Sequence, residues 1–129
     1  MNGRSIGYWA TTVLVAIMLV PGGIVQVLRM PENAAGFAHL GYPLYFMVWL
    51  GICKLLGGVV LLLPRLPRLK EWAYAGIAID FTSATVSHAA SGDALWHVIA
   101  PLVCTAILLT SWALRPADRL LGHIGARPA

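Results

Sequence analysis

Four long runs of apolar residues limit most strongly what this chain can fold into. They cover about residues 8–27, 42–63, 72–90 and 96–114, and charged residues or prolines separate them. A helix needs about 20 mostly apolar residues to cross the hydrocarbon core of a bilayer, which is about 30 Å thick. We therefore expect four membrane-spanning helices that form a single domain over residues 1–129.

The shortage of charge supports the same conclusion. Charged residues make up 11% of the chain and hydrophobic residues 59%. Soluble domains carry about 25% charged residues, so this chain has too few to cover a water-facing surface. Disordered chains are poor in apolar residues and rich in charge, which excludes that class as well. The composition predicts an all-α, polytopic membrane protein, a four-helix bundle in contact with the lipid bilayer.

Basic residues are concentrated on one side of the predicted bundle. Seven of the nine Lys and Arg residues fall before the first run, between the second and third, or after the fourth. An excess of Lys and Arg marks the cytoplasmic side, so we expect both termini in the cytoplasm. The net charge of +4 is then a topology signal, and no basic-aromatic patch points to nucleic acid. The seven residues are Arg4, Arg65, Arg68, Lys70, Arg115, Arg119 and Arg127.

Two charged residues fall inside the apolar runs, where a charge costs about 2.5–3.5 kcal/mol on insertion scales. Lys54 lies ten residues before Pro64, and Asp80 lies nine residues after Glu71. At about 1.5 Å per residue, the two charges lie at nearly the same depth from the cytoplasmic boundary. A short loop joins their spans, so the spans are antiparallel neighbours. We predict a Lys54–Asp80 ion pair near the membrane midplane, with either a functional or a purely structural role.

Small and polar residues share the helix faces that carry these two charges. Small residues mark close helix contacts in membranes, so we expect both faces to point into the bundle. The inward-facing residues would be Gly51, Lys54 and Gly58 on the second span, and Gly76, Asp80, Ser83, Ala84, Ser87 and His88 on the third.

A second group of polar residues lies near the opposite, non-cytoplasmic boundary. Its members end or begin different spans, so the helices should bring them to one level. Imidazoles titrate near neutral pH and can relay protons, bind metal or hydrogen-bond a ligand carbonyl. Two facing histidines are a weak basis for a metal or haem site, because a catalytic metal generally has three protein ligands, and none is predicted. The group comprises Gln26, Arg29, His39, His88, Asp93 and His97.

Three segments carry a more specific pattern: residues 39–46 (HLGYPLYF), 50–57 (LGICKLLG) and 67–76 (PRLKEWAYAG). Together they resemble the DoxX-like family of small bacterial membrane proteins, over about residues 6–115. The resemblance implies a four-helix bundle in the bacterial inner membrane. It also relates the chain to the membrane subunit of thiosulfate:quinone oxidoreductase and to proteins linked to oxidative stress. By position, it implies a polar set of His39, Lys54, Asp80 and His88.

These features lead to three hypotheses about function. The first is a binding module for a small lipophilic ligand such as a quinone, possessing no catalytic domain of its own and joined to a partner redox subunit. The second is a membrane enzyme, an isomerase or an epoxide-opening enzyme, in which Asp80 or His88 moves a proton. The third is a proton-coupled transporter, which four short spans would reach only as a homo-oligomer. The cavity would be lined by Tyr42, Tyr45 and Trp49, with Lys54, Asp80 and His88 as polar anchors and Gln26, Arg29, His39 and His97 as further ligand contacts.

Overall fold

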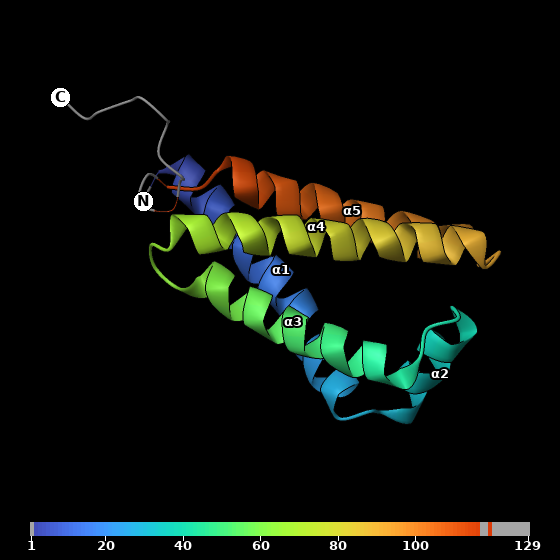
Figure 1. Ribbon diagram of the computed structural model, residues 1–129. Helices are drawn as coiled ribbons and strands as arrows, with labels where there is room; N and C mark the ends of the chain where they lie inside the picture. Colours follow the sequence, from blue (N-terminus) through green and yellow to red (C-terminus); the bar gives the residue numbers. More distant parts are fainter. Residues whose placement is uncertain (1, 117–118, 120–129) are drawn as a thin grey trace.

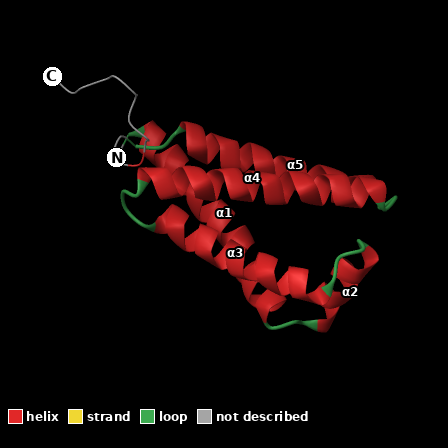
Figure 2. Ribbon diagram, viewed as in Figure 1, coloured by secondary structure: helices red, strands yellow, loops and turns green. Residues whose placement is uncertain are grey.

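The structure is a computed structural model that describes residues 2–116 and 119 of the chain. Within the described residues the fold consists of five α-helices and no strand (Figures 1 and 2). The expected all-α class is confirmed. Of the seven basic residues predicted to lie on the cytoplasmic side, Arg127 lies outside the described residues. The helices are α1 (Gly3–Val27), α2 (Pro31–His39), α3 (Leu44–Leu62), α4 (Pro67–Ala90) and α5 (Leu95–Ala113).

The four long helices coincide with the four apolar runs. In the part of the chain that the structure describes, α1, α3 and α5 are long and apolar enough to cross a membrane. α4 is 24 residues long but less apolar, because it carries Arg68, Lys70 and Glu71 in its first turns and Asp80 near its middle. The chain is therefore an all-helical protein with membrane-spanning helices, and the number of spans depends on whether α4 also crosses.

α2 is a short helix that the sequence analysis did not predict. Pro31 occupies its first turn, where the missing N–H of proline costs nothing, and Glu32 in the same turn favours the positive end of the helix dipole. None of its residues is buried, so its own packing does not explain why it stays in place. Its position next to the ends of α1 and α3 makes it one wall of the site described below (Figure 1).

The helices form two pairs that diverge from one end of the molecule. α1 packs on α3, α4 packs on α5, and the space between α3 and α4 widens toward α2 (Figure 1). Six buried side chains form the core that joins the two pairs. They are Val15, Leu19, Leu61, Tyr74, Ile77 and Leu108.

Glycines set the close approach of α1 and α3. A Cβ added to Gly23 would lie 2.9 Å from the carbonyl oxygen of Gly51, and a Cβ on Gly51 would lie 2.9 Å from that of Gly23. A Cβ on Gly58 would similarly meet Val20 at 2.8 Å, so the predicted close packing of Gly51 and Gly58 is confirmed. Gly76 makes no such close contact, because a Cβ there would have no neighbour within 4 Å; this residue lines the cavity described below instead.

Polar side chains hold the other end of the bundle together. The buried Lys70 ammonium donates to the carbonyl oxygens of Val60 and Leu63, which lie in the last turn of α3 and just past its end. Such carbonyls have no hydrogen-bond donor within their own helix, so the lysine supplies the donor that they lack. On the neighbouring pair, Arg115 forms an ion pair with Glu71. Lys70 and Arg115, which the sequence analysis used only to predict the orientation in the membrane, therefore also connect helix ends.

A matched pair of substitutions tests the α1–α3 contact. We expect Gly23→Ala to destabilise the protein by about 1–3 kcal/mol, because the added methyl group meets the rigid backbone of Gly51. Gly22→Ala is the control, since a Cβ at Gly22 meets nothing within 4 Å and alanine favours the helix by up to about 1 kcal/mol. The measurement is the denaturation midpoint of both variants in the same detergent. Equal midpoints would contradict the proposed contact.

Candidate functional site

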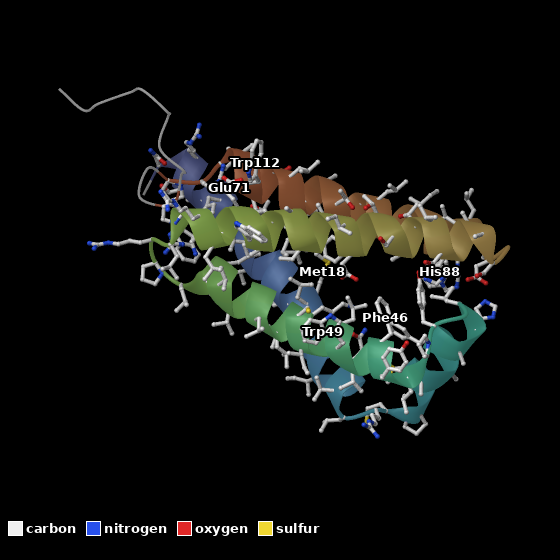
Figure 3. All side chains as sticks on the ribbon, in the orientation of Figure 1. Met18, Phe46, Trp49, Glu71, His88 and Trp112 are labelled. Atoms are coloured by element: carbon white, nitrogen blue, oxygen red, sulfur yellow. The ribbon has the colours of Figure 1, made fainter. Side chains whose placement is uncertain are left out.

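A cavity of about 370 Å³ lies between the two diverging helix pairs. Side chains of α1, α3 and α4 and of the α2 segment surround it, and most of its wall is apolar. Figure 3 shows Phe46 of α3 and His88 of α4 on opposite sides of this space. A mostly apolar wall with a few placed polar groups is typical of small-molecule sites between the helices of a bundle. The apolar wall includes Phe37, Leu40, Phe46, Leu50 and Ile79.

The predicted Lys54–Asp80 ion pair is present at the inner wall of the cavity. Lys54 Nζ lies 3.8 Å from Asp80 Oδ2, and the two side chains are 18% and 15% exposed. That separation exceeds the usual hydrogen-bond range of about 2.7–3.2 Å, so the two charges attract each other without forming a hydrogen bond. Both groups therefore keep hydrogen-bonding capacity that a ligand in the cavity can use.

Helical periodicity explains which residues reach the cavity. On α3, Phe46, Leu50 and Lys54 recur every four residues and line it together. On α4 the predicted inward face is confirmed, since all its members line the cavity. These α4 residues are Gly76, Asp80, Ser83, Ala84, Ser87 and His88.

Two aromatic residues predicted to line the cavity face outward instead. Tyr45 and Trp49 are 78% and 61% exposed and lie outside the cavity wall. Each precedes a wall residue, Phe46 or Leu50, by one position, which turns it by about 100° around the helix. The expectation was wrong because it extended a helical face from Tyr42, which lines the cavity from the loop before α3.

Four residues form a polar mouth at the wide end of the cavity, and we call this group the mouth cluster: His39, His88, Asp93 and His97. Asp93 accepts hydrogen bonds from both sides, with its carboxylate 2.6 Å from His39 Nε2 and 2.7 Å from His88 Nδ1. The rings of His88 and His97 stack with their centroids 5.3 Å apart. The sequence correctly predicted that the ends of different helices bring these four side chains together.

The loop after α4 places Asp93 in this cluster. Gly92 adopts a positive φ of 70°, which glycine tolerates without strain and which ends the helix. The Asp93 N–H then donates to the carbonyl of His88, which brings the two side chains to the same side of the turn. His39 reaches the same carboxylate from the last turn of α2. This contact attaches the otherwise exposed α2 to the opposite helix pair.

The two histidines hold the pKa of Asp93 below its ordinary value. The hydrogen bond from His88 is the larger cause and the one from His39 the second. In its neutral form, a His88 ring that donates Nδ1–H to Asp93 keeps Nε2 as a proton acceptor. His88 itself lines both the cavity and its mouth.

Gln26 and Arg29 end up in different places although the sequence grouped them together. Gln26 is 5% exposed and lines the cavity, and within residues 2–116 its Oε1 has no hydrogen-bond partner. Arg29 is exposed and lines neither the cavity nor its mouth, which corrects the expectation for this residue. The reason is local, since Arg29 has a positive φ of 56° where the chain turns out of α1 toward α2.

Two contributions to the site were missed by sequence reasoning. Phe37 and Leu40 line the cavity because α2 exists, and the proline at its start was the available signal. The hydroxyl groups of Tyr42 and Ser87 lie 2.6 Å apart, which links the start of α3 to α4. No group of three or more His, Cys, Asp or Glu side chains that could hold a metal ion occurs in the described chain.

Comparison with known proteins identifies one family. The profile described as the DoxX-like family matches residues 10–111. The matched region runs from α1 into α5 and contains every residue of the cavity and of the mouth cluster. No curated protein and no solved structure matches the chain.

The bridging role of Asp93 is tested by Asp93→Asn. We expect this variant to loosen α2, because the amide has one acceptor oxygen and no charge to pair with His39 and His88. The measurement is the hydrogen-exchange protection of α2 amides in detergent, which should fall while that of α5 stays unchanged. Ser91→Ala is the control, since it changes an exposed polar side chain of the same turn as Asp93 and should leave the protection of α2 unchanged.

The lowered pKa of Asp93 fixes how this difference depends on pH. The folded state binds the Asp93 proton less tightly than the unfolded state. The contribution of the ionised Asp93 carboxylate to the stability of the folded state is therefore fully present above the ordinary pKa of 3.8. It is lost as the pH falls through the lowered value. Wild type and Asp93→Asn should therefore differ at neutral pH and converge in strong acid. Equal protection of α2 at neutral pH would contradict the bridge.

Proposed function

The chain belongs to the DoxX-like family, and from this premise we propose that it is an integral membrane protein that binds a small, quinone-like lipophilic ligand within its helices. The observation that carries the proposal is the apolar cavity with the Lys54–Asp80 pair in its wall. Intramembrane charges are expensive and mark functional sites. Here they lie beside a space large enough for a ring-sized molecule.

In this proposal α4 is the fourth membrane span. Its 24 residues extend about 36 Å at 1.5 Å per residue, which exceeds the hydrocarbon thickness. Asp80 faces the interior, where it pairs with Lys54. Trp72 and Val86, which lie fourteen residues apart on one face of α4, are 80% and 66% exposed and provide apolar contacts for lipid.

The basic residues supply the orientation. Arg4 near the start of α1, Lys70 near the start of α4 and Arg115 just after α5 belong to one end of the bundle, which the positive-inside rule assigns to the cytoplasm. Both termini would then be cytoplasmic. The mouth cluster would open toward the non-cytoplasmic face of a bacterial inner membrane.

Cysteine labelling tests whether α4 crosses the membrane. In a Cys53→Ala and Cys104→Ala background, a membrane-impermeant maleimide added to intact bacterial cells should label Ser91→Cys and Glu32→Cys. Arg68→Cys should be labelled only after the cells are opened. If α4 did not cross, position 91 would lie on the same side as position 68. Protection of Ser91→Cys in intact cells would therefore exclude a fourth span.

The residues of the cavity fit a quinone-like ligand. The Lys54 ammonium can donate to a ring carbonyl, and Asp80 balances its charge in the low-dielectric interior. Phe46 and Ile79 supply apolar contact for the ring. At the mouth, His88 is oriented by Asp93 and can hold or release a proton. A quinone accepts electrons and protons, and in this proposal a partner redox subunit supplies the electrons.

A charge-free double variant separates ligand binding from structure. Lys54→Met together with Asp80→Leu removes both charges, and such replacements of buried ion pairs are often neutral or stabilising. We expect the fold to be retained and the affinity for a short-chain ubiquinone analogue to fall about 10- to 100-fold, because hydrogen bonds to charged groups are worth about 1.5–3 kcal/mol. The measurement is quenching of tryptophan fluorescence by the quinone. Unchanged affinity would assign the pair a purely structural role.

A further inference from the structure

A second cavity, of about 490 Å³, lies between the later half of α3 and the first half of α4, and we call it the side groove. Its floor is closed, because Leu19 of α1 and Ile77 of α4 are buried. Its rim is open, because Leu56 and Trp72 are exposed. The groove therefore opens sideways, which in a membrane is toward the lipid. The other residues that line only this space are Cys53, Gly57, Val60, Leu69 and Ala73.

The side groove meets the ligand cavity at the level of the Lys54–Asp80 pair. Four residues line both spaces, two from each helix, so the boundary between the spaces crosses from α3 to α4. At Gly76 an added Cβ would have no neighbour within 4 Å, so a hydrocarbon chain has room to pass along the backbone of α4. The four shared residues are Leu50, Lys54, Gly76 and Asp80.

The two spaces differ in their chemistry. The ligand cavity adds polar side chains of α4 to the ion pair, namely Ser83, Ser87 and His88. The side groove adds no charged residue to the pair among the described residues that line it. A binding site that changes from polar to apolar across an ion pair fits an amphiphile, with its polar ring on one side and its hydrocarbon chain on the other.

The shape of the side groove also fits a chain. From Lys54 to Val60 it follows α3 for about 9 Å, at about 1.5 Å per residue. From Asp80 to Leu69 it follows α4 for about 16 Å on the same scale. The groove is therefore elongated along the helices and longer than a single ring.

We propose that the side groove holds the hydrocarbon tail of a ligand whose ring occupies the ligand cavity. This inference rests on the proposed ligand-binding function and names the ligand class, a long-tailed membrane lipid with a polar ring. The tail leaves one apolar environment for another, since lipid tails are as apolar as the side chains of the groove. The groove therefore contributes packing contacts and orients the ring against Lys54 and Asp80, where ring and tail join.

Substitutions that fill the groove test this proposal. Cys53→Phe and Gly57→Leu add volume to the side groove, and neither residue lines the ligand cavity. Both variants should fold, because Cys53 is exposed and a Cβ on Gly57 would lie at an ordinary distance of 3.4 Å from Ile77. We expect the affinity for a decyl-tailed benzoquinone to fall about tenfold through lost dispersion contacts, and the affinity for the same ring without a tail to stay unchanged.

Quenching of tryptophan fluorescence in one detergent measures both affinities, so the partition of each quinone into micelles is the same for every protein. Ile52→Phe is the matched control, because Ile52 is the exposed neighbour of Cys53 and lines neither space. It should keep both wild-type affinities. An unchanged affinity for the tailed quinone in both groove variants would overturn the proposal, and so would an equal loss for the two quinones.

A photoreactive tail gives a second measurement that needs no substituted protein. The probe is the decyl-tailed benzoquinone with a diazirine at the end of its tail, bound to the full chain in detergent. Cross-links should form on Trp72 and Ala73, and an excess of the tail-less quinone should suppress them because it occupies the ring site. Trp112 reports non-specific contact, since it is exposed on α5 and lines neither space. Cross-links in the groove that persist under this competition would show that it takes any lipid chain, and the proposal would be wrong.

The outcomes separate this inference from the function on which it rests. If the tail-less quinone binds but the tail cross-links outside the side groove, the ligand cavity is a ring site and the inference alone fails. If neither quinone binds wild type, the proposed function and the inference both fail. A loss confined to the tailed quinone, together with cross-links that the tail-less quinone suppresses, supports both.

Discussion

The hydrocarbon core of a membrane offers no hydrogen-bonding partner, and this constraint explains where the polar groups of the chain lie. Thr12 of α1 and Tyr74 of α4 both bond to the hydroxyl group of Ser111 on α5, so that three helices share one buried network. Lys70 donates hydrogen bonds to the backbone carbonyls at the end of α3. These groups are satisfied within the protein. Among residues 2–116, one fully buried side-chain atom has no hydrogen-bond partner, Gln26 Oε1, and Gln26 borders the cavity.

The geometry of the bundle follows from two kinds of contact at opposite ends. At the end with the hydroxyl network, apolar packing and the Glu71–Arg115 pair draw the four long helices together. At the other end α1 and α3 remain in contact through Gly23 and Gly51, but α4 and α5 diverge from them (Figure 1). The separated arms are bridged by polar contacts such as His39–Asp93 rather than by apolar packing. A cavity with an apolar wall and a polar mouth is the consequence.

Much of this arrangement could be predicted from the sequence, because charged residues, whose burial in a membrane costs free energy, are easily recognised within long apolar runs. Equal depth on antiparallel spans predicted the Lys54–Asp80 contact, and the period of the helix predicted the inward face of α4. α2 was missed because a nine-residue helix without buried side chains depends on a tertiary contact through His39. The burial of Lys70 was missed for a similar reason, since no local pattern tells that the end of another helix lies beside it.

Stability alone gives little reason to keep a lysine and an aspartate inside this bundle. Removing charges from water is costly, and apolar residues of similar volume generally serve at least as well. The close approach of α1 and α3 is already provided by glycines, and the contacts between the helix pairs by the core around Leu61 and Tyr74. Lys54 and Asp80 add neither a hydrogen bond between them nor a tightly packed interface, but they border the cavity next to Gln26. The proposed ligand would account for their retention, because both charges border the cavity that it would occupy.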